Sequence, residues 1–257
     1  MGSTEGLLKR KMWKITIHKS LKFNNAILIE GLPGIGNVGK VVVDYLIEQN
    51  KADLYKRFFS YDLPNTVFVN QDNLVELPVI ELYHKKINGQ DYLFLAGEVQ
   101  PRTERSSYEF SDVILSICKE HKVKEIITLG GIGLSEPKEK PLIYTTGNDK
   151  DLINKLVEYG VNKEIYGVVG PILGLTGLLL GMSERYGVSA ATLLVETYNN
   201  PMYLGLKEAK ELMLVLNNLY DLNISFDDLE KEINNDVEEE TSISKNTKRF
   251  KETNYIG

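Results

Sequence analysis

Apolar residues along this chain form two patterns, short continuous runs and longer stretches at helical spacing. The runs at residues 26–30 and 125–129 are typical of strands buried on both faces of a sheet. Further strands are predicted at residues 13–17, 54–60, 66–70, 142–146, 166–169 and 190–196. Apolar positions spaced by three or four predict helices at residues 38–46, 110–121, 152–157, 174–186 and 206–220. This alternation favours an α/β fold with a mostly parallel central sheet and helices on both faces.

One pair of strands is expected to be antiparallel. The dipeptide Asn88-Gly89 separates the apolar runs at residues 79–86 and 91–96. A two-residue hairpin turn needs positive φ at both central positions, and Asn-Gly meets that need best. The sequence therefore predicts an antiparallel hairpin added to the parallel sheet.

Residues 165–183 carry no charge and approach the length of about 20 residues that a membrane span requires. Pro171 and five glycines divide this segment into short pieces. A strand, a turn and a buried helix fit it better than a transmembrane helix does. We therefore expect no membrane segment.

The composition changes after Ile233. From Asp227 to the end the chain has nine acids and five bases, and a run of three glutamates is followed by Ser, Thr, Asn and Lys. Such a segment buries too little apolar surface to offset its ordering entropy. We predict a single α/β domain over residues 1–233 and a flexible acidic C-terminal tail over residues 234–257.

The sequence has 257 residues and a net charge of −6. This net negative charge gives no electrostatic attraction to nucleic acid. Cys118 is its sole cysteine, so no internal disulfide is possible. No apolar run follows the basic residues 9–11, so a signal peptide is not expected. These features favour a cytoplasmic protein.

The sharpest motif is the glycine turn at residues 34–39, which reads GxGxxG between a predicted strand and a predicted helix. This arrangement is typical of dinucleotide sites, where backbone amides meet a pyrophosphate. Asp62 is the nearest acid for a ribose, but more short strands follow it in place of a second βα unit. We favour the alternative that Gly34, Gly36 and Gly39 permit a tight turn and close packing.

Other candidate chemistry has an ordinary structural explanation. Cys118 and His121 lie three apart on one helix, but both fall on its apolar stripe. Glu98 follows a strand end and could form a polar pocket with Arg102, Glu104 and Arg105. Salt bridges that cap the next helix are the simpler explanation of these charges, and we favour it. No cysteine or histidine cluster suggests a metal. We predict no catalytic residue, no metal and no cofactor.

Several ordered segments together resemble the proteasome assembly chaperone family, in its archaeal branch. They are residues 30–39 (EGLPGIGNVG), 97–101 (GEVQP), 129–131 (LGG), 170–181 (GPILGLTGLLLG) and 194–197 (LVET), followed by Asn200-Pro201. The resemblance covers about residues 25–220. It implies a nucleoside-phosphorylase-like α/β domain, without established catalysis and independent of ATP.

The resemblance also implies a small homo-oligomer that binds proteasome α subunits or the 20S proteasome. Some archaeal relatives end in a hydrophobic–Tyr–any motif that docks between α subunits. Here Tyr255 is third from the end, so Tyr255, Ile256 and Gly257 are a candidate docking tip that departs from the pattern. An inert terminus is the alternative.

Two other functions stay open at this point. One is an enzyme or sensor that binds a nucleoside or nucleotide at the glycine turn and Glu98. The other is a purely structural oligomer or proteasome cap.

Overall fold

The computed structural model describes residues 12–167, 169–200 and 203–234. The chain divides into two compact units, Met1–Ile224 and Ser225–Gly257. In the second unit, residues 227–234 are helical.

The predicted flexible tail begins at Asn234, and the rest of it lies outside the described residues. The same holds for its predicted docking tip, Tyr255, Ile256 and Gly257.

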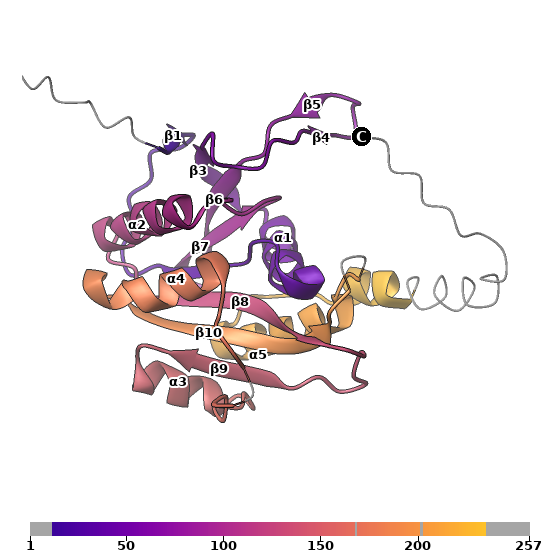
Figure 1. Cartoon of the computed structure of the whole chain (residues 1–257). Helices are drawn as coiled ribbons and strands as arrows, with labels where there is room; N and C mark the ends of the chain where they lie inside the picture. Colours follow the sequence, from indigo (N-terminus) through magenta and orange to yellow (C-terminus); the bar gives the residue numbers. More distant parts are fainter. Residues whose placement is uncertain (1–11, 168, 201–202, 235–257) are drawn as a thin grey trace, which may run out of the picture. The chain divides into compact units, whose positions relative to one another are not determined.

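The first unit is built on an eight-stranded sheet with the order β1-β3-β6-β7-β2-β8-β10-β9 (Figure 1). The strands are β1 (Lys14–Ile17), β2 (Ile27–Glu30), β3 (Asp53–Phe59), β6 (Ile80–Ile87), β7 (Gln90–Gly97), β8 (Glu125–Leu134), β9 (Ile143–Gly147) and β10 (Ser189–Tyr198). The central strands β7, β2, β8 and β10 are parallel, and the strands outside them pair antiparallel. The predicted α/β fold with a parallel centre is confirmed, and the complete sheet is mixed.

The predicted hairpin is also confirmed. Strands β6 and β7 are joined by Asn88 and Gly89, whose φ angles are 48° and 86°. Because β7 is one of the central parallel strands, the hairpin belongs to the main sheet. A separate two-stranded sheet is formed by β4 (Phe68–Val69) and β5 (Val75–Glu76).

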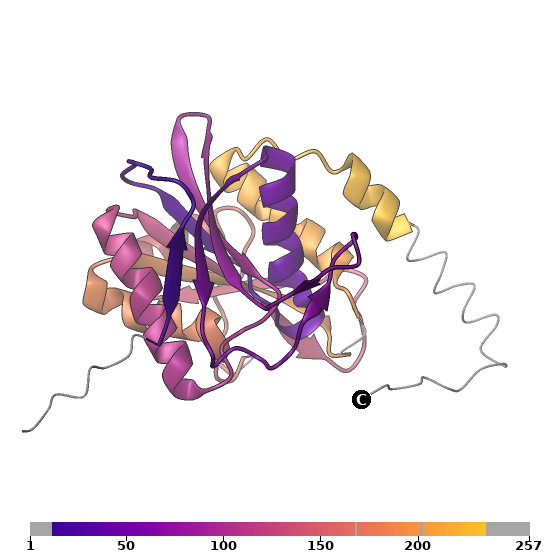
Figure 2. The same ribbon diagram turned by 90° about the horizontal axis from the view of Figure 1, so that it is seen from above.

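Helices cover both faces of the sheet, as the sequence predicts. They are α1 (Val38–Asn50), α2 (Glu104–Glu120), α3 (Lys150–Val157), α4 (Gly174–Ser183) and α5 (Leu206–Tyr220), with short 3-10 helices η1 (Ile35–Asn37) and η2 (Glu184–Tyr186). Helices α2 and α4 pack against each other on one face, and α1 packs with α5 on the other (Figures 1 and 2). Helix α3 lies beside β9 and β10.

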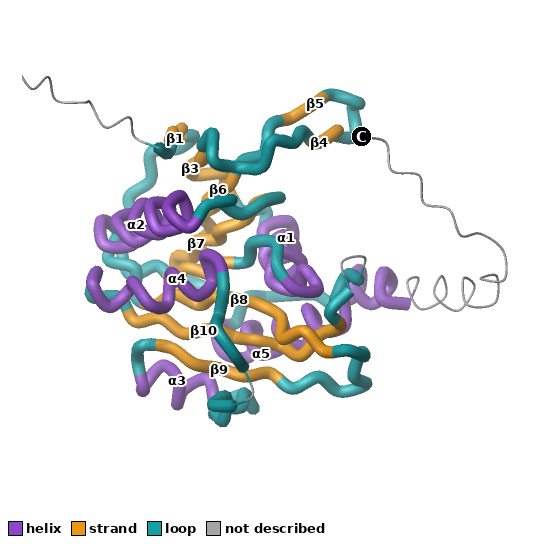
Figure 3. The backbone as a smooth tube through the Cα atoms, in the orientation of Figure 1, coloured by secondary structure: helices purple, strands orange, loops and turns teal. Residues whose placement is uncertain are grey.

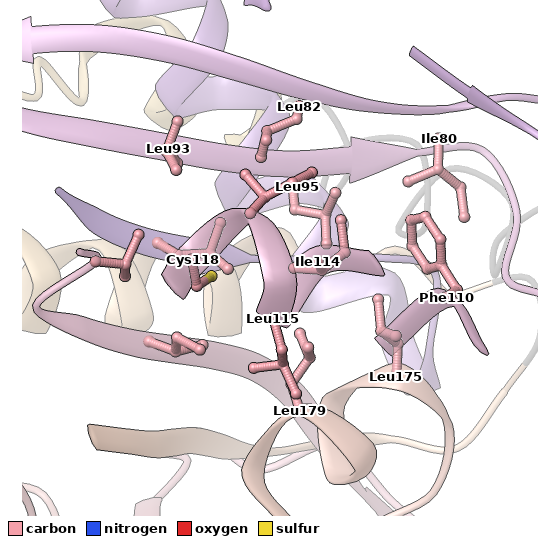
Figure 4. Close-up of a cluster of buried hydrophobic side chains, with 14 of the residues drawn as sticks. Ile80, Leu82, Leu93, Leu95, Phe110, Ile114, Leu115, Cys118, Leu175 and Leu179 are labelled. Atoms are coloured by element: carbon pink, nitrogen blue, oxygen red, sulfur yellow. The ribbon is translucent and has the colours of Figure 1, made fainter. Parts of the chain in front are cut away.

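Strand β7 shows why a central strand carries a continuous apolar run, here residues 92–96. Leu93 and Leu95 point into the core beneath α2 and α4 (Figure 4). The alternate residue Tyr92 points to the other face, where its hydroxyl donates to the backbone carbonyl of Tyr220 at 3.0 Å. Side chains of a strand alternate between the two faces. Both sets are buried here, so no polar position interrupts the run.

The strand predicted at residues 166–169 is not present. Gly167 has a φ of 79° and turns the chain, so that Tyr166 and Val169 form only an isolated bridge with each other. Tyr166 is fully exposed. The segment that leads to α4 is a loop (Figure 3). In the described parts of the chain, no helix is long and apolar enough to cross a bilayer.

Candidate functional site

The glycine turn lies at the carboxyl end of β2, between the parallel neighbours β7 and β8. Helix α1 follows the turn on one face, and α2 connects β7 to β8 on the other. Open α/β sheets bind ligands at such a switch point, because the loops diverge there and leave a crevice. The turn is therefore in the place where a site is expected.

Two of the three motif glycines stand where a side chain has no room. A Cβ on Gly39 would lie 2.7 Å from the backbone oxygen of Leu129 in β8. Gly36 has a φ of 64°, and its Cβ would lie 2.5 Å from Oγ1 of Thr197. Gly34 differs, since the nearest atom to its Cβ would be 4.0 Å away. These distances support a packing role for Gly36 and Gly39.

The topology does not provide the second strand that a dinucleotide site needs. In that fold, the acid for the ribose ends a parallel strand next to the glycine turn. Here β3 is antiparallel and is separated from β2 by β6 and β7. Asp62, which follows β3, is therefore not placed to bind a ribose at the turn.

Glu98 is brought near the turn, but it faces a lysine. Lys40 lies at the start of α1, and its Nζ is 2.7 Å from Oε1 of Glu98 and 2.5 Å from Oδ2 of Asp44. Two carboxylates therefore neutralise the cation closest to the glycine motif. An anionic ligand would have to compete with both.

A cavity of about 510 Å³ opens beside the glycine turn. It is lined by Leu32, Gly34, Ile35, Gly39, Gln100, residues 129–133, residues 169–174, Thr176 and Leu194. The volume falls in the range of small-molecule sites. None of these lining residues is charged, so the cavity suits an uncharged group and offers no counter-charge to a phosphate.

Gln100 fixes one wall of this cavity. Its Nε2 donates to the carbonyl of Pro33 at 2.6 Å, and its Oε1 accepts from the amide of Leu175 at 3.1 Å. The side chain therefore ties the glycine turn to the first turn of α4. The sequence analysis missed this residue because its two partners are distant in the chain.

Glu30 is a fully buried carboxyl behind the same wall. Its Oε1 accepts from the amide of Leu32 at 3.1 Å, and its Oε2 accepts from the hydroxyl of Thr176 at 3.2 Å. Burial raises the pKa of Glu30 to about 7, although both hydrogen bonds act in the opposite direction. An acid that ends an apolar strand was the available signal, and the sequence analysis did not use it.

A comparison of the sequence with models of known protein families identifies the family of this chain. The model of the PAC2 family matches residues 28–241. The chain belongs to the PAC2 family. The resemblance inferred from the sequence motifs is therefore confirmed.

Solved structures of this fold match almost the whole chain. PbaB of Pyrococcus furiosus, described as an archaeal proteasome activator, is 27% identical, with a TM-score of 0.83 over 91% of this chain and 100% of that one. PbaA of the same organism, described as an archaeal homolog of proteasome-assembly chaperone, is 23% identical, with a TM-score of 0.77 over 92% and 93%. The uncharacterised protein MJ1210 of Methanocaldococcus jannaschii is 31% identical over 80% of this chain and 78% of its own length.

In this PAC2 chain the motifs that carry the resemblance meet at one place. Glu30 bonds to Thr176, and Gln100 bonds to Pro33. Gly36 packs on Thr197. Segments far apart in the sequence thus lock the glycine turn to β10 and α4. The segments that carry the family resemblance therefore form a packed junction beside the cavity.

The remaining charged candidates do not line the cavity. Arg102 donates from Nη1 to Oδ1 of Asn65 at 3.0 Å, and Arg105 pairs with Glu109 one turn along α2. Glu104 lies in the first turn of α2, where a negative charge interacts favourably with the helix dipole. Of the expected salt bridges at this helix, the structure shows the pair Arg105–Glu109, whereas Arg102 bonds to a neutral amide.

Cys118 and His121 lie in the core beneath α2. Burial raises the pKa of the Cys118 thiol to about 12, so that it stays protonated at neutral pH. The ring of His121 stacks on Phe23 at 4.1 Å between centroids, and its Nε2 lies 2.8 Å from the hydroxyl of Tyr55. Burial lowers the pKa of His121. Neither side chain is arranged as a nucleophile and base.

The described residues contain no group of three side chains that could hold a metal ion.

Proposed function

We propose that this protein is a non-catalytic, ATP-independent chaperone or adaptor of the proteasome, which binds α subunits or their precursors in the cytoplasm. The observation that carries the proposal is the likeness to PbaB, which extends over the whole of that chain. PbaA adds support through its description as a homolog of an assembly chaperone. In the proposal the protein acts as a homo-oligomer.

The chemistry around the glycine turn supports this proposal. Gly36 and Gly39 are used in internal packing, and the nearby cation Lys40 is paired with two carboxylates. The polar groups of Gln100 and Thr176 are engaged with the protein itself. A function through protein contacts needs none of these groups to be free.

The tip Tyr255, Ile256 and Gly257 is the docking element in our proposal. A tyrosine and an isoleucine at the end of an acidic tether keep an apolar group at high local concentration near a large partner.

The test is the mass of complexes formed between the purified chain and proteasome α subunits. We expect a complex with the unaltered chain, and weakened binding when Tyr255→Ala and Ile256→Ala are combined. The matched control replaces Thr253 and Asn254 by alanine and leaves the tip intact. Absence of any complex with the unaltered chain would remove the proposal. Undiminished binding of the tip variant would remove only the tail from it.

A second candidate function rests on the cavity of about 510 Å³, which has the size of a nucleoside site. Its uncharged lining favours a neutral nucleoside over a nucleotide. Ligand at about 100 times its Kd would stabilise the native state by about 2.7 kcal/mol, which a thermal melt detects. Adenosine and inosine should raise the Tm more than AMP does. Unchanged Tm values across that panel would argue against this candidate.

A further inference from the structure

Strands β4 and β5 form an arm (residues 67–77) that extends beyond the main sheet (Figure 1). Its two strands pair with each other and with no strand of the large sheet. Isolated two-stranded ribbons are marginally stable in water unless one of their faces packs on something. The arm therefore needs a packing partner for at least one of its faces.

The register places four aliphatic side chains on one face of the arm. Val69 is directly opposite Val75, so both point to the same side. Val67 and Leu77 flank the two strands, two positions away from Val69 and Val75, and continued alternation of the side chains assigns them to that side too. All four are well exposed, at 51%, 67%, 68% and 59% for Val67, Val69, Val75 and Leu77. We call these four residues the arm face.

The other side of the arm is the one that packs on the domain. Phe68 alternates with Val69 and contacts the hydrophobic core. Asn70 orders the turn at the tip, since its Oδ1 accepts from the amide of Leu74 at 2.9 Å and its Nδ2 donates to Glu76 at 2.8 Å. The arm is thus held in place through one side and its turn, while its aliphatic side faces solvent. An ordered patch of this kind marks an interaction surface.

The same chain has an uncovered sheet edge. In the described part of the chain, β1 pairs only with β3, and all four of its residues are exposed, including Ile15 at 45% and Ile17 at 63%. The opposite edge strand, β9, is covered, because Asn162 exchanges backbone hydrogen bonds with Ile143 and Thr145 at 2.8 Å each. An open edge with exposed isoleucines is a template for pairing with another chain.

The charges around these two surfaces are complementary. Residues 61–80, which contain the arm, have three acids and no lysine, arginine or histidine. Residues 13–22, which contain β1, have three lysines and one histidine and no acid. One of the lysines, Lys19, pairs with Asp53 of β3 at 2.6 Å, which leaves Lys14 and Lys22 as the cations around this edge. Two arms placed together would bring acids against acids. In a contact between the arm and a β1 edge, the acids near the arm would face the lysines near β1. The valines of the arm face would meet Ile15 and Ile17.

We propose that the arm face docks on the β1 edge of a second copy of this chain. The two surfaces differ, so the contact is heterologous and runs from the arm of one copy to the edge of the next. This inference does not depend on proteasome binding, because the two surfaces belong to this chain alone.

The first test removes each surface separately and measures the native mass of the full-length protein. Val69→Ser with Val75→Ser alters the arm face, and Ile15→Ser with Ile17→Ser alters the edge. The matched control, Leu142→Ser with Leu204→Ser, changes two exposed leucines outside both surfaces, at 49% and 45% exposure. We expect an oligomer for the unaltered chain and the control, and a monomer of 29.1 kDa for each altered surface.

The second test mixes the two altered proteins in equal amounts. The arm variant keeps an intact edge and the edge variant keeps an intact arm, so one complete contact remains. We expect a heterodimer of twice the chain mass. Arms that pair with arms would give no rescue on mixing, and that result would overturn the proposal. An unaltered chain that is monomeric, or variants that keep the full oligomer, would overturn it as well.

A cysteine pair keeps the proposal testable if a serine variant fails to fold. Cys118, the native cysteine, is buried and protonated, so introduced cysteines react in its place. Leu77→Cys mixed with Ile17→Cys should give a disulfide-linked dimer under mild oxidation. Leu142→Cys mixed with Ile17→Cys is the control. Equal cross-linking in both mixtures would overturn the proposal.

Discussion

The glycine turn and the arm stand in contrast within the same domain. The turn at residues 34–39 has a conspicuous sequence, and two of its glycines, Gly36 and Gly39, lie against Thr197 and Leu129 of other segments. The arm has an ordinary sequence of valines and leucines, and its aliphatic face is bare. In this chain the glycine motif marks positions where two segments pack too closely to admit a side chain. The surface open to a partner becomes visible only from burial.

The physical reason for this contrast is that the two features restrict the choice of residue to different degrees. A backbone approach that excludes a Cβ restricts the residue to glycine, so it is visible in the letters. An exposed strand face and a buried one both use valine and leucine. The difference between them depends on neighbours from elsewhere in the fold.

The largest expected effect concerns Glu30 beneath the turn. Its pKa is about 7 in the folded protein against an ordinary 4.5, so between these pH values the folded state keeps a proton that the unfolded state releases. The stabilisation is complete below pH 4.5 and is lost as the pH rises through 7. The loss amounts to about 3 kcal/mol. Glu30→Gln should remove this part of the pH dependence.

Urea denaturation of both proteins at several pH values between 4.5 and 8 measures this effect. The control is Glu136→Gln, an exposed acid. Parallel stability profiles for the unaltered chain and Glu30→Gln would show that the buried carboxyl does not titrate in this range.

The next effect separates two glycines of the same motif. Gly39→Ala puts a Cβ 2.7 Å from the oxygen of Leu129 and should lower the free energy of unfolding by about 2 kcal/mol. Gly34→Ala meets nothing closer than 4.0 Å and should change it by less than about 0.5 kcal/mol. Denaturant midpoints compare the two. Equal destabilisation would contradict the packing assignment.

A smaller effect is expected for the cation beside the turn. The carboxylates that pair with Lys40 are 45% and 54% exposed, so water screens both ion pairs. Lys40→Met should cost less than about 1 kcal/mol in stability. It should also leave the thermal response to AMP unchanged. A Tm rise with AMP that disappears in Lys40→Met would restore the nucleotide interpretation of the turn.

The smallest effect on stability is expected in the arm. Val69→Ser and Val75→Ser should each change the unfolding free energy of the monomer by about 0.5 kcal/mol or less, because neither side chain is buried there. Denaturation at concentrations where all variants are monomeric measures this. A large loss would mean that the arm face supports the fold of its own chain.

Much of the fold could be predicted from the sequence. The helices α1, α2 and α5 and the buried strands β2 and β8 follow from apolar spacing, which local chemistry sets. The Asn88-Gly89 turn was equally readable. The strand expected at residues 166–169 failed because the positive φ of Gly167 turns the chain. Periodicity alone does not distinguish an apolar loop from a strand.

The site was predictable only in part. Gly36 and Gly39 were readable because their requirement is local. The roles of Glu30 and Gln100 depend on Thr176 and Leu175, which the fold brings to them from distant positions. No local pattern encodes such pairs.

We propose that this PAC2 protein acts through contacts with proteasome subunits. The most direct measurement is native mass spectrometry of the full-length protein mixed with purified proteasome α subunits, without nucleotide. We expect a complex that contains both proteins, and the same complex with Gly34→Ala at the glycine turn. Unassociated α subunits and an unchanged mass of this protein at micromolar concentrations would contradict it.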